Sequence, residues 1–502
     1  MKITLESPIN QYYVQTLAMI FFPGEHFGKK GKDTEAETAE NEPSLFVRSE
    51  AIENGVKAFA VVEWKGKRCE AEYTAEKTDG RSEERTLKLA VGGAVLAAMG
   101  DLIGYRPAWG MMIGVRPSKV ATEMLEAGIS KTRTKKILTT DYLVIPKKAA
   151  LATDIAVTEK RIVGEPSPKD CSMYISIPFC PSRCTYCSFV SYTSKRLLDL
   201  IPQYLVRLKE DIRENFALAD RLGLRIRTVY IGGGTPTILD EEQIRDLLSH
   251  IASLTDVSAL DEYTMEAGRP DTITEEKLRI AKEYGVTRVS VNPQSLCDEV
   301  LCGIGRNHSV EEFFRAFEDA RRAKIHTVNV DLIAGLPGDN FRRFSSTVDH
   351  ILQLRPENIT VHTFCVKKSA EILRLNADVY SVRGGDAGKC VDYSQIKAHQ
   401  AGYVPYYMYR QKNTVGNYEN VGFSLPEHEG LYNIYMMEEI HTILASGAGA
   451  VTKLVDRTVS RTEARNIERL FHQKYPYEYL SEDRSVSFAE TAERFYREHG
   501  LL

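Results

Sequence analysis

The sequence has no long apolar run, few cysteines and tryptophans, and no excess of charge of either sign. Its 502 residues include 9 cysteines, 2 tryptophans, 65 basic and 69 acidic side chains, for a formal net charge of −4. The longest apolar run lies between Lys88 and Asp101 and is shorter than the roughly 18 residues that a membrane span needs. The first residues lack the apolar core of a signal peptide. We therefore predict no membrane span and a cytoplasmic location.

These scarcities also narrow the class of protein. A nearly balanced charge provides no field that would attract nucleic acid, so no nucleic-acid partner is expected. Nine cysteines in this chain are too few for a disulfide scaffold, and in a reducing compartment a tight cysteine group indicates a metal or catalytic site. Hydrophobic residues at 43% and charged residues at 27% are typical of a globular protein with more than one domain.

The pattern of apolar residues divides the chain into three predicted domains. Residues 1–165 mix strand and helix patterns and predict an N-terminal α+β accessory domain. Residues 166–368 alternate regularly between the two patterns. Residues 369–502 form a C-terminal extension that we expect to be mostly helical and to cover the substrate. The predicted fold class is therefore α/β, with additions at both ends.

The alternating region predicts a parallel sheet. Short apolar runs occur at 174–179, 228–231, 262–266, 287–292, 325–331 and 357–362. Helical patterns separate them at 196–220, 240–253, 274–284, 309–323 and 341–353. Repeated strand–helix–strand units give parallel strands with right-handed crossovers. An open sheet and a full or partial barrel both satisfy this pattern.

Three cysteines follow the first strand of that region with the spacing C-x3-C-x2-C: Cys180, Cys184 and Cys187. Thiolates are soft ligands that suit iron–sulfur clusters and zinc. Three ligands leave one iron of a four-iron cluster open for chemistry, whereas a structural zinc usually takes four ligands. A [4Fe–4S] cluster is therefore favoured over a zinc site or three buried free thiols. Cys171 precedes the strand and would lie at its other end.

Other polar and glycine-rich positions fall where the strands end. The run Gly232-Gly-Gly-Thr235 follows the second strand, where residues without a Cβ allow the backbone to approach a ligand closely. A tight strand-to-helix turn is the simpler explanation of such a run. Glu266, Gln294, Arg306 and Asp331 also lie at or just past strand ends, where α/β folds place their sites. Solvent-facing caps are the alternative for these four.

Five ordered motifs carry a resemblance to a known family: YISIPFC at 174–180, GGGTPT at 232–237, RVSVNPQS at 288–295, GRNH at 305–308 and DLIAGLPG at 331–338. Together they resemble the radical S-adenosylmethionine (SAM) enzymes, and more narrowly the oxygen-independent coproporphyrinogen III oxidase family. Residues 410–422 and the long N-terminal extension are most similar to the coproporphyrinogen dehydrogenase HemZ branch of that family.

The resemblance implies a fold, two cofactors and a set of contacts. The fold would be a radical SAM partial (β/α)6 TIM-like barrel, with Cys180, Cys184 and Cys187 holding a [4Fe–4S] cluster. One or two SAM molecules would bind beside the cluster. The residues implied as SAM contacts are Tyr174, Tyr186, Gly233, Gly234, Thr235, Glu266, Gln294, Arg306, Asp331 and Cys365. Of these, Tyr174, Glu266 and Arg306 are expected to act directly in catalysis.

The resemblance also implies partners. A tetrapyrrole substrate carries several propionates, which need cations. Lys367, Arg410 and Lys412 are the candidates, and a solvated basic face is the alternative reading of them. A cluster of this kind also requires a low-potential electron donor of the flavodoxin or ferredoxin type.

One position departs from the family pattern. The decarboxylating oxidases of this family typically carry a further cysteine two residues after the third, and Phe189 stands there. We predict oxidative decarboxylation of coproporphyrinogen III to protoporphyrinogen IX by a 5′-deoxyadenosyl radical. A haem-binding chaperone and a radical SAM methyltransferase acting on haem or another tetrapyrrole are the alternatives, because their relatives also lack that cysteine. A shared fold does not fix the reaction.

Overall fold

A computed structural model describes the chain except residues 24–41, 79–80, 115, 188, 190, 366–384, 412–413, 459–464 and 482–487. Contacts divide the described residues into two compact units. The first consists chiefly of Met1–Val157 with Arg410–Tyr418, and the second of residues 158–365, Asp386–Tyr409 and Glu419–Leu502. The predicted division into domains at 165 and 368 stays a prediction.

The first unit is built on a four-stranded sheet in the order β1-β2-β3-β4. β1 (Lys2–Glu6) pairs in parallel with β2 (Ser44–Ile52), and β3 (Gly55–Trp64) and β4 (Lys67–Glu76) follow as an antiparallel meander. Buried and more exposed residues alternate along β2 and β4, as in a sheet covered on one face. The helices of this part of the chain are α1 (Gln11–Phe21), α2 (Glu83–Ile103), α3 (Pro117–Glu126), α4 (Lys131–Thr140) and α5 (Pro146–Val163).

Helix α2 is the core helix of the first unit. The Ser82 side chain accepts a hydrogen bond from the Arg85 amide at its start, and Gly104 ends it in the left-handed conformation. By length and composition this helix could cross a bilayer, but 67% of its most apolar window is buried. A Cβ on Gly93 would lie 2.3 Å from the Tyr73 ring of β4. The missing side chain therefore lets the helix pack closely on the sheet.

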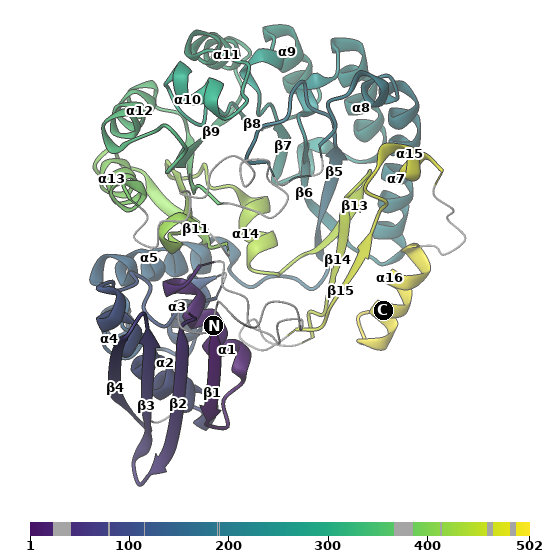
Figure 1. The fold of residues 1–502 in the computed structure, drawn as a ribbon. Coiled ribbons are helices and arrows are strands. Elements are labelled where there is room, and N and C mark those ends of the chain that lie inside the picture. The colour runs from purple at the N-terminus through teal and green to yellow at the C-terminus, as the bar shows by residue number, and fades with distance from the viewer. Residues whose placement is uncertain are drawn as a thin grey trace, which may run out of the picture. The chain divides into compact units, whose positions relative to one another are not determined.

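The second unit contains an eleven-stranded sheet in the order β11-β12-β10-β9-β8-β7-β6-β5-β13-β14-β15. Strands β5 to β10 each pair in parallel with the next along the chain. Figure 1 shows helices α7 to α13 on the outer side of this curved sheet. The strands are β5 (Asp170–Ile177), β6 (Arg225–Gly233), β7 (Glu262–Glu266), β8 (Arg288–Ser290), β9 (Thr327–Ala334), β10 (Asn358–Thr363), β11 (Val404–Tyr409), β12 (Asn420–Ser424), β13 (Thr442–Ser446), β14 (Val451–Val455) and β15 (Ile467–Phe471).

The crossover helices are amphipathic and are capped by their own sequences. Reciprocal capping boxes start α8 at Asp240 and Gln243, and α11 at Ser309 and Glu312, which satisfies donors that a helix start leaves free. The helices are α6 (Lys195–Leu198), α7 (Ile201–Arg221), α8 (Glu241–Leu254), α9 (Glu275–Glu283), α10 (Asp298–Gly303), α11 (Val310–Arg322), α12 (Phe341–Leu354), α13 (Ala387–Gln400), α14 (Leu431–Met437), α15 (Pro476–Leu480) and α16 (Phe488–Glu498).

In its described residues, the C-terminal extension contains strands as well as the predicted helices. It contributes five strands, β11 to β15, as well as helices α13 to α16. β12 pairs antiparallel with β10, and β13 pairs in parallel with β5, so the extension lengthens the sheet at both edges. A six-stranded open sheet would leave two unpaired edges, and these strands cover them. The runs VPYYMY and TILAS within β11 and β13 carry the aromatic and β-branched residues that favour strands.

The start of helix α14 lies against the end of the sheet where β7 begins. Glu262 accepts hydrogen bonds from the backbone amides of Leu431 (2.8 Å) and Tyr432 (3.2 Å) and pairs with Arg288 (3.2 Å). The ring of Tyr432 stacks on Tyr230 with centroids 4.5 Å apart. Aromatic rings therefore fill this end of the sheet interior, and the opposite, carboxyl end carries the polar groups described below.

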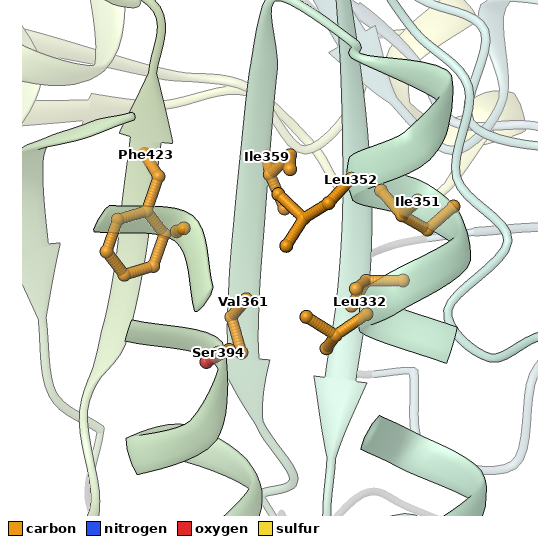
Figure 2. A pocket seen from close by; sticks show the side chains of 9 residues that line it. Leu332, Ile351, Leu352, Ile359, Val361, Ser394 and Phe423 are labelled. Atoms are coloured by element: carbon orange, nitrogen blue, oxygen red, sulfur yellow. The ribbon is translucent and has the colours of Figure 1, made fainter. Parts of the chain in front are cut away.

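A small apolar space lies between the sheet and two outer helices (Figure 2). Its lining comes from β9, β10, β12, α12 and α13, and its one polar side chain is Ser394. The Ser394 hydroxyl already donates to the Val391 carbonyl at 2.8 Å. With no polar group directed into it, this space is a packing gap of the core rather than a ligand site.

Candidate functional site

The cysteine loop begins immediately after β5 and is tied down by backbone hydrogen bonds. The amide of Cys180 donates to the Tyr192 carbonyl (3.0 Å), and the amide of Thr185 donates to the Ile304 carbonyl (3.0 Å). The amide of Cys187 donates to the carbonyl of Cys184 (3.1 Å). One loop thus presents three thiols at the carboxyl end of the parallel strands, where α/β proteins bind their ligands.

Burial keeps two of these thiols protonated. Burial raises the pKa of Cys180 to about 11, although a hydrogen bond with the Thr235 hydroxyl (3.3 Å between Sγ and Oγ1) acts to lower it. The neighbouring Cys184 and Cys187 raise that pKa further, so the three thiols lie within electrostatic reach of one another. Burial likewise raises the pKa of Cys187. Metal binding removes these protons, so a bound metal centre would relieve the repulsion that the loop creates.

Three cysteines on one loop are a ligand set of iron–sulfur clusters, in which each thiolate binds an iron. Among the described residues, no three His, Cys, Asp or Glu side chains lie close enough to hold one metal ion. Cys171 cannot complete the set, since it lies at the start of β5, beside Thr442 of β13.

The glycine loop after β6 packs directly on the cysteine loop. The amides of Gly234 and Thr235 donate to the carbonyls of Ile177 and Phe179, both at 2.8 Å. A Cβ on Gly234 would lie 2.5 Å from the Phe179 carbonyl oxygen, and Gly233 has φ +109°. Both positions therefore require glycine. The Thr235 amide thus bonds to Phe179, the residue immediately before Cys180.

Glu266, at the end of β7, is a buried carboxyl. Burial, together with the nearby charge of Asp331, raises the pKa of Glu266 to about 7, although a hydrogen bond donated by the Tyr230 hydroxyl acts to lower it. The ring of Tyr230 stacks on Tyr174 of β5 with centroids 6.1 Å apart. Glu266 therefore changes its charge near neutral pH, beside the aromatic pair.

Asp331, on β9, is held in the opposite charge state. Burial alone would raise its pKa, but hydrogen bonds from neighbouring groups, His362 foremost, lower it. Asn292 and Asn329 each donate to the carboxylate at 2.8 Å, and the His362 Nε2 lies 3.7 Å from its Oδ2. Two carboxyls with diverging pKa values, facing one interior, are typical of a functional site.

Gln294 and Arg306 direct polar groups into the same region. Gln294 has φ +68°, a conformation that costs energy for a residue with a side chain. Its Oε1 is buried and has no hydrogen-bond partner among the described residues. Arg306 donates to the Asn292 carbonyl at 2.6 Å and contacts Tyr186, while its Nε has no partner in the described part of the chain.

These observations fit the two cofactors that the sequence implies. The thiols of one loop suit an iron–sulfur cluster. The unpartnered Gln294 oxygen suits a bound ligand with donors of its own. The individual assignments of Tyr174, Tyr186, Gly233, Gly234, Thr235, Glu266, Gln294, Arg306, Asp331 and Cys365 as SAM contacts stay predictions.

Of the predicted substrate cations, Arg410 alone lies within the described residues. Arg410 belongs to the first unit, where its guanidinium is buried, donates to the carbonyls of Met112 and Asn417 and lies over the Trp109 ring. Lys367 and Lys412 lie outside the described residues. Cys365 follows β10 and lies close to Tyr409.

Sequence reasoning missed two residues of the site. Arg269 is buried, pairs with Asp271 (3.1 Å), donates to the Ser182 hydroxyl (2.9 Å) and lies 3.8 Å from Cys184 Sγ. His362 joins Asp331 to the hydroxyl of Tyr409, which lies 3.2 Å from its Nδ1. The signal for Arg269 was its place just past a strand end, where the other site residues also lie. His362 follows the alternation of β10 that turns every second residue inward.

The fold and the cysteine loop define a class of protein. Residues 174–351 match the Radical SAM superfamily. The solved structure of coproporphyrinogen III oxidase (HemN) from Escherichia coli, a radical SAM enzyme, superposes with a TM-score of 0.50 at 20% identity, covering 65% of this chain and 71% of that one. This likeness supports the fold, which is a mixed α/β radical SAM fold.

Similar proteins of known name show to which family of radical SAM proteins the chain belongs. The chain is 38% identical over 365 residues to the oxygen-independent coproporphyrinogen-III oxidase-like protein HemZ of Bacillus subtilis (strain 168), covering 71% of this chain and 72% of that protein. It is also 36% identical over 197 residues to the heme chaperone HemW of the same organism, covering 39% of this chain and 51% of that protein. The chain therefore belongs to the oxygen-independent coproporphyrinogen III oxidase-like family of radical SAM proteins.

Proposed function

We propose that this protein catalyses the oxygen-independent oxidative decarboxylation of coproporphyrinogen III to protoporphyrinogen IX in the cytoplasm. In this reaction two propionate side chains each lose a hydrogen atom, carbon dioxide and one electron, which leaves two vinyl groups. The observation that carries the proposal is the joint placement of the cysteine loop, the glycine loop and the carboxyl pair at one end of the barrel strands, in a chain similar to HemZ over most of its length.

The cofactors follow from the site. Cys180, Cys184 and Cys187 would hold a [4Fe–4S] cluster, and the predicted SAM contacts would hold one or two SAM molecules. When bound, the reduced cluster and SAM supply a 5′-deoxyadenosyl radical that takes the propionate hydrogen atom. A low-potential donor of the flavodoxin or ferredoxin type would provide the electron.

The chain's own residues would bind and orient the cofactors and the substrate, and would keep water out of the site. Gly233 and Gly234 let the glycine loop pack on the cysteine loop, and the Gln294 oxygen would accept from a ligand the donor that it lacks among the described residues. Arg306 would bind a carboxylate, and Asp331 would accept from hydroxyl or amino donors. The stacked rings of Tyr174 and Tyr230 form a dry wall beside Glu266, which protects a reactive radical from water. Lys367, Arg410 and Lys412 remain the proposed cations for the substrate propionates.

An anaerobic turnover assay tests this proposal. Cluster-loaded protein is given SAM, dithionite and coproporphyrinogen III, and the products are analysed by liquid chromatography with mass detection. We expect loss of two carbon dioxide units per substrate and about two molecules of 5′-deoxyadenosine per product, since each propionate needs one radical. The Cys184→Ser variant serves as the inactive control. Release of deoxyadenosine with unchanged coproporphyrinogen contradicts the decarboxylase.

Haem binding is the second candidate function. Two observations favour it: Phe189 stands where the decarboxylases typically have a cysteine, and heme chaperones named HemW are among the relatives. A chaperone would bind haem stoichiometrically and yield no decarboxylated product. Haem titration followed by absorbance in the same preparation distinguishes the two, and a methylated haem product would instead indicate the methyltransferase.

A further inference from the structure

Aromatic rings form a patch beside the cysteine loop, here named the aromatic patch: Tyr192, Tyr475 and Tyr477. Tyr475 and Tyr477 are 46% and 53% exposed, and Phe189 of the cysteine loop is 69% exposed. The rings of Tyr475 and Tyr477 stack with centroids 5.6 Å apart, and Tyr192 lies 5.6 Å from Tyr475. Large rings this exposed are unusual on a protein surface, and a group of them marks an interaction site.

Backbone hydrogen bonds connect Tyr192 of the aromatic patch, and Phe189 of the cysteine loop, to two of the predicted cluster ligands. The Tyr192 carbonyl accepts the hydrogen bond of the Cys180 amide at 3.0 Å, and the Tyr192 hydroxyl donates to the Lys474 carbonyl at 3.2 Å. The backbone amide of Phe189 donates to the sulfur of Cys187. The patch is therefore attached directly to the loop that carries the thiols.

This side is also where the cysteine loop is least covered. Cys180 and Cys184 are buried, while Cys187 is only half-buried. The ring of Phe189 is exposed two residues further along. Of the three cysteines, Cys187 is thus the most exposed, and Arg183 lies within electrostatic reach of both Cys187 and Tyr192 of the patch.

Two cations border the aromatic patch. Arg183 is exposed and lies within electrostatic reach of both Cys187 and Tyr192. Lys474, whose backbone carbonyl accepts the Tyr192 hydroxyl, is also exposed. Within the described part of the chain neither cation forms an ion pair, although Glu478 also lies near Tyr192. Apolar rings bordered by unpaired positive charge are complementary to an acidic partner with an apolar centre.

We propose that the aromatic patch, with Arg183 and Lys474, is the docking site for the small acidic electron-transfer protein that reduces the cluster. This inference rests on the proposed cluster but not on the identity of the tetrapyrrole reaction. The partner carries a one-electron flavin or iron–sulfur centre. One electron passes from that reduced centre to the oxidised cluster, and no bond is made or broken.

The test compares two reductants on the same protein. Photoreduced bacterial flavodoxin, an acidic protein, and dithionite, a small molecule, are each mixed anaerobically with cluster-loaded protein, and loss of cluster absorbance is followed in time. The double variant Tyr475→Ser, Tyr477→Ser should slow reduction by flavodoxin by roughly tenfold, in keeping with loss of interface aromatics. Reduction by dithionite should be unchanged. Phe471→Ser, which alters a ring on β15 that is 63% exposed, serves as the matched control.

A charge-reversal variant adds a second readout. Arg183→Glu should reduce the flavodoxin rate most at low ionic strength, because salt screens exposed charges. The proposal of a docking site is overturned if flavodoxin reduces the cluster at the same rate in the wild type, the double tyrosine variant and Arg183→Glu. Slowing with both reductants also overturns it, since that result reports a damaged cluster. A wild type that takes up no cluster contradicts the proposed function itself. Dimers that form in the wild type and vanish in the double variant assign the patch to a second copy of the chain instead.

Discussion

At the residue scale, the site rests on two carboxyls whose surroundings separate their pKa values. Burial raises the pKa of Glu266 to about 7, and donors from His362, Asn329 and Thr360 outweigh burial at Asp331 and lower its pKa. Near neutral pH one carboxyl is therefore ready to change its charge while the other stays ionised. This difference leads to a pH dependence that can be measured.

Binding of SAM, a cation at its sulfonium, should tighten as the pH rises through about 7. Below that value Glu266 is protonated and neutral, and above it the carboxylate attracts the ligand; the gain approaches a factor of roughly ten per pH unit below the pKa. Calorimetric titration of cluster-loaded protein between pH 6 and 8 measures it. Glu266→Gln should bind more weakly and without this slope. A flat wild-type profile contradicts the role given to Glu266.

Arg269 should be needed to retain the cluster. Its guanidinium joins the loop after β7 to Ser182 and Cys184 of the cysteine loop, and it is buried with Asp271. Arg269→Gln removes a donor near the thiolate and leaves Asp271 without its cation, so we expect less than half the wild-type iron content and a more negative cluster potential. Iron analysis and redox titration followed by electron paramagnetic resonance measure both.

The control for Arg269 is Arg279→Gln, which alters an exposed arginine paired with Glu276 on α9. Exposed pairs of this kind contribute little to stability, so iron content and potential should match the wild type. Unchanged values in Arg269→Gln would mean that the contact with Cys184 has no influence on the centre.

At the element scale, periodicity predicted the parallel strands and their crossover helices well, and the strands of the C-terminal extension poorly. The apolar runs at 262–266 and 357–362 correspond to β7 and β10, and the pattern at 341–353 to α12. Each of these elements carries its own signal, because one face packs on a neighbour. Of the strands in the extension, β12 joins the sheet by pairing with β10 and β13 by pairing with β5, and no local pattern encodes such pairing between distant residues.

The same distinction separates the site residues that could be predicted from those that could not. The spacing of the three cysteines and the run of glycines are local signals. His362 and Arg269 acquire their contacts only when β10 comes to lie beside β9, and the loop after β7 beside the cysteine loop. The expected position of Glu266 at the end of its strand was local, but its raised pKa arises from burial and from Asp331.

A change in the glycine loop should also disturb the cysteine loop, because the two loops are packed together. In Gly234→Ala the new methyl group would meet the Phe179 carbonyl at 2.5 Å, so the loop must shift, at a cost of about 1–3 kcal/mol. We expect weaker SAM binding and a lower cluster content. Gly303→Ala in α10, where no atom lies within 4 Å of the new group, should change neither. Equal SAM affinity in both variants would contradict the close packing described here.

Glu262 should hold α14 in place. Its carboxylate accepts two backbone amides of that helix and pairs with Arg288, all buried. Glu262→Gln leaves the Arg288 charge unpaired, and breaking a buried pair in this way costs about 3–5 kcal/mol. Thermal unfolding should show a clearly lower Tm. Glu283→Gln, at an exposed pair with Arg245, should leave Tm close to that of the wild type, and a similar drop in both variants would contradict the account.

At the scale of the whole molecule, family membership and reaction are separate questions. Similarity to HemZ extends over 71% of this chain, whereas the match to HemW covers 39%. The radical SAM region is therefore common to relatives with different names, and a shared fold does not fix the reaction. The wall of tyrosines and the separated carboxyls suit radical chemistry in a dry interior.

The most direct test of the proposed decarboxylation is to trace the β-hydrogen of the substrate propionate into 5′-deoxyadenosine. Coproporphyrinogen III deuterated at the β-positions of its propionates is supplied anaerobically with SAM and reductant, and 5′-deoxyadenosine is analysed by mass spectrometry. The account predicts one deuterium in each deoxyadenosine and a matching amount of divinyl product. Deoxyadenosine without deuterium, formed at the same rate with and without coproporphyrinogen, would contradict it.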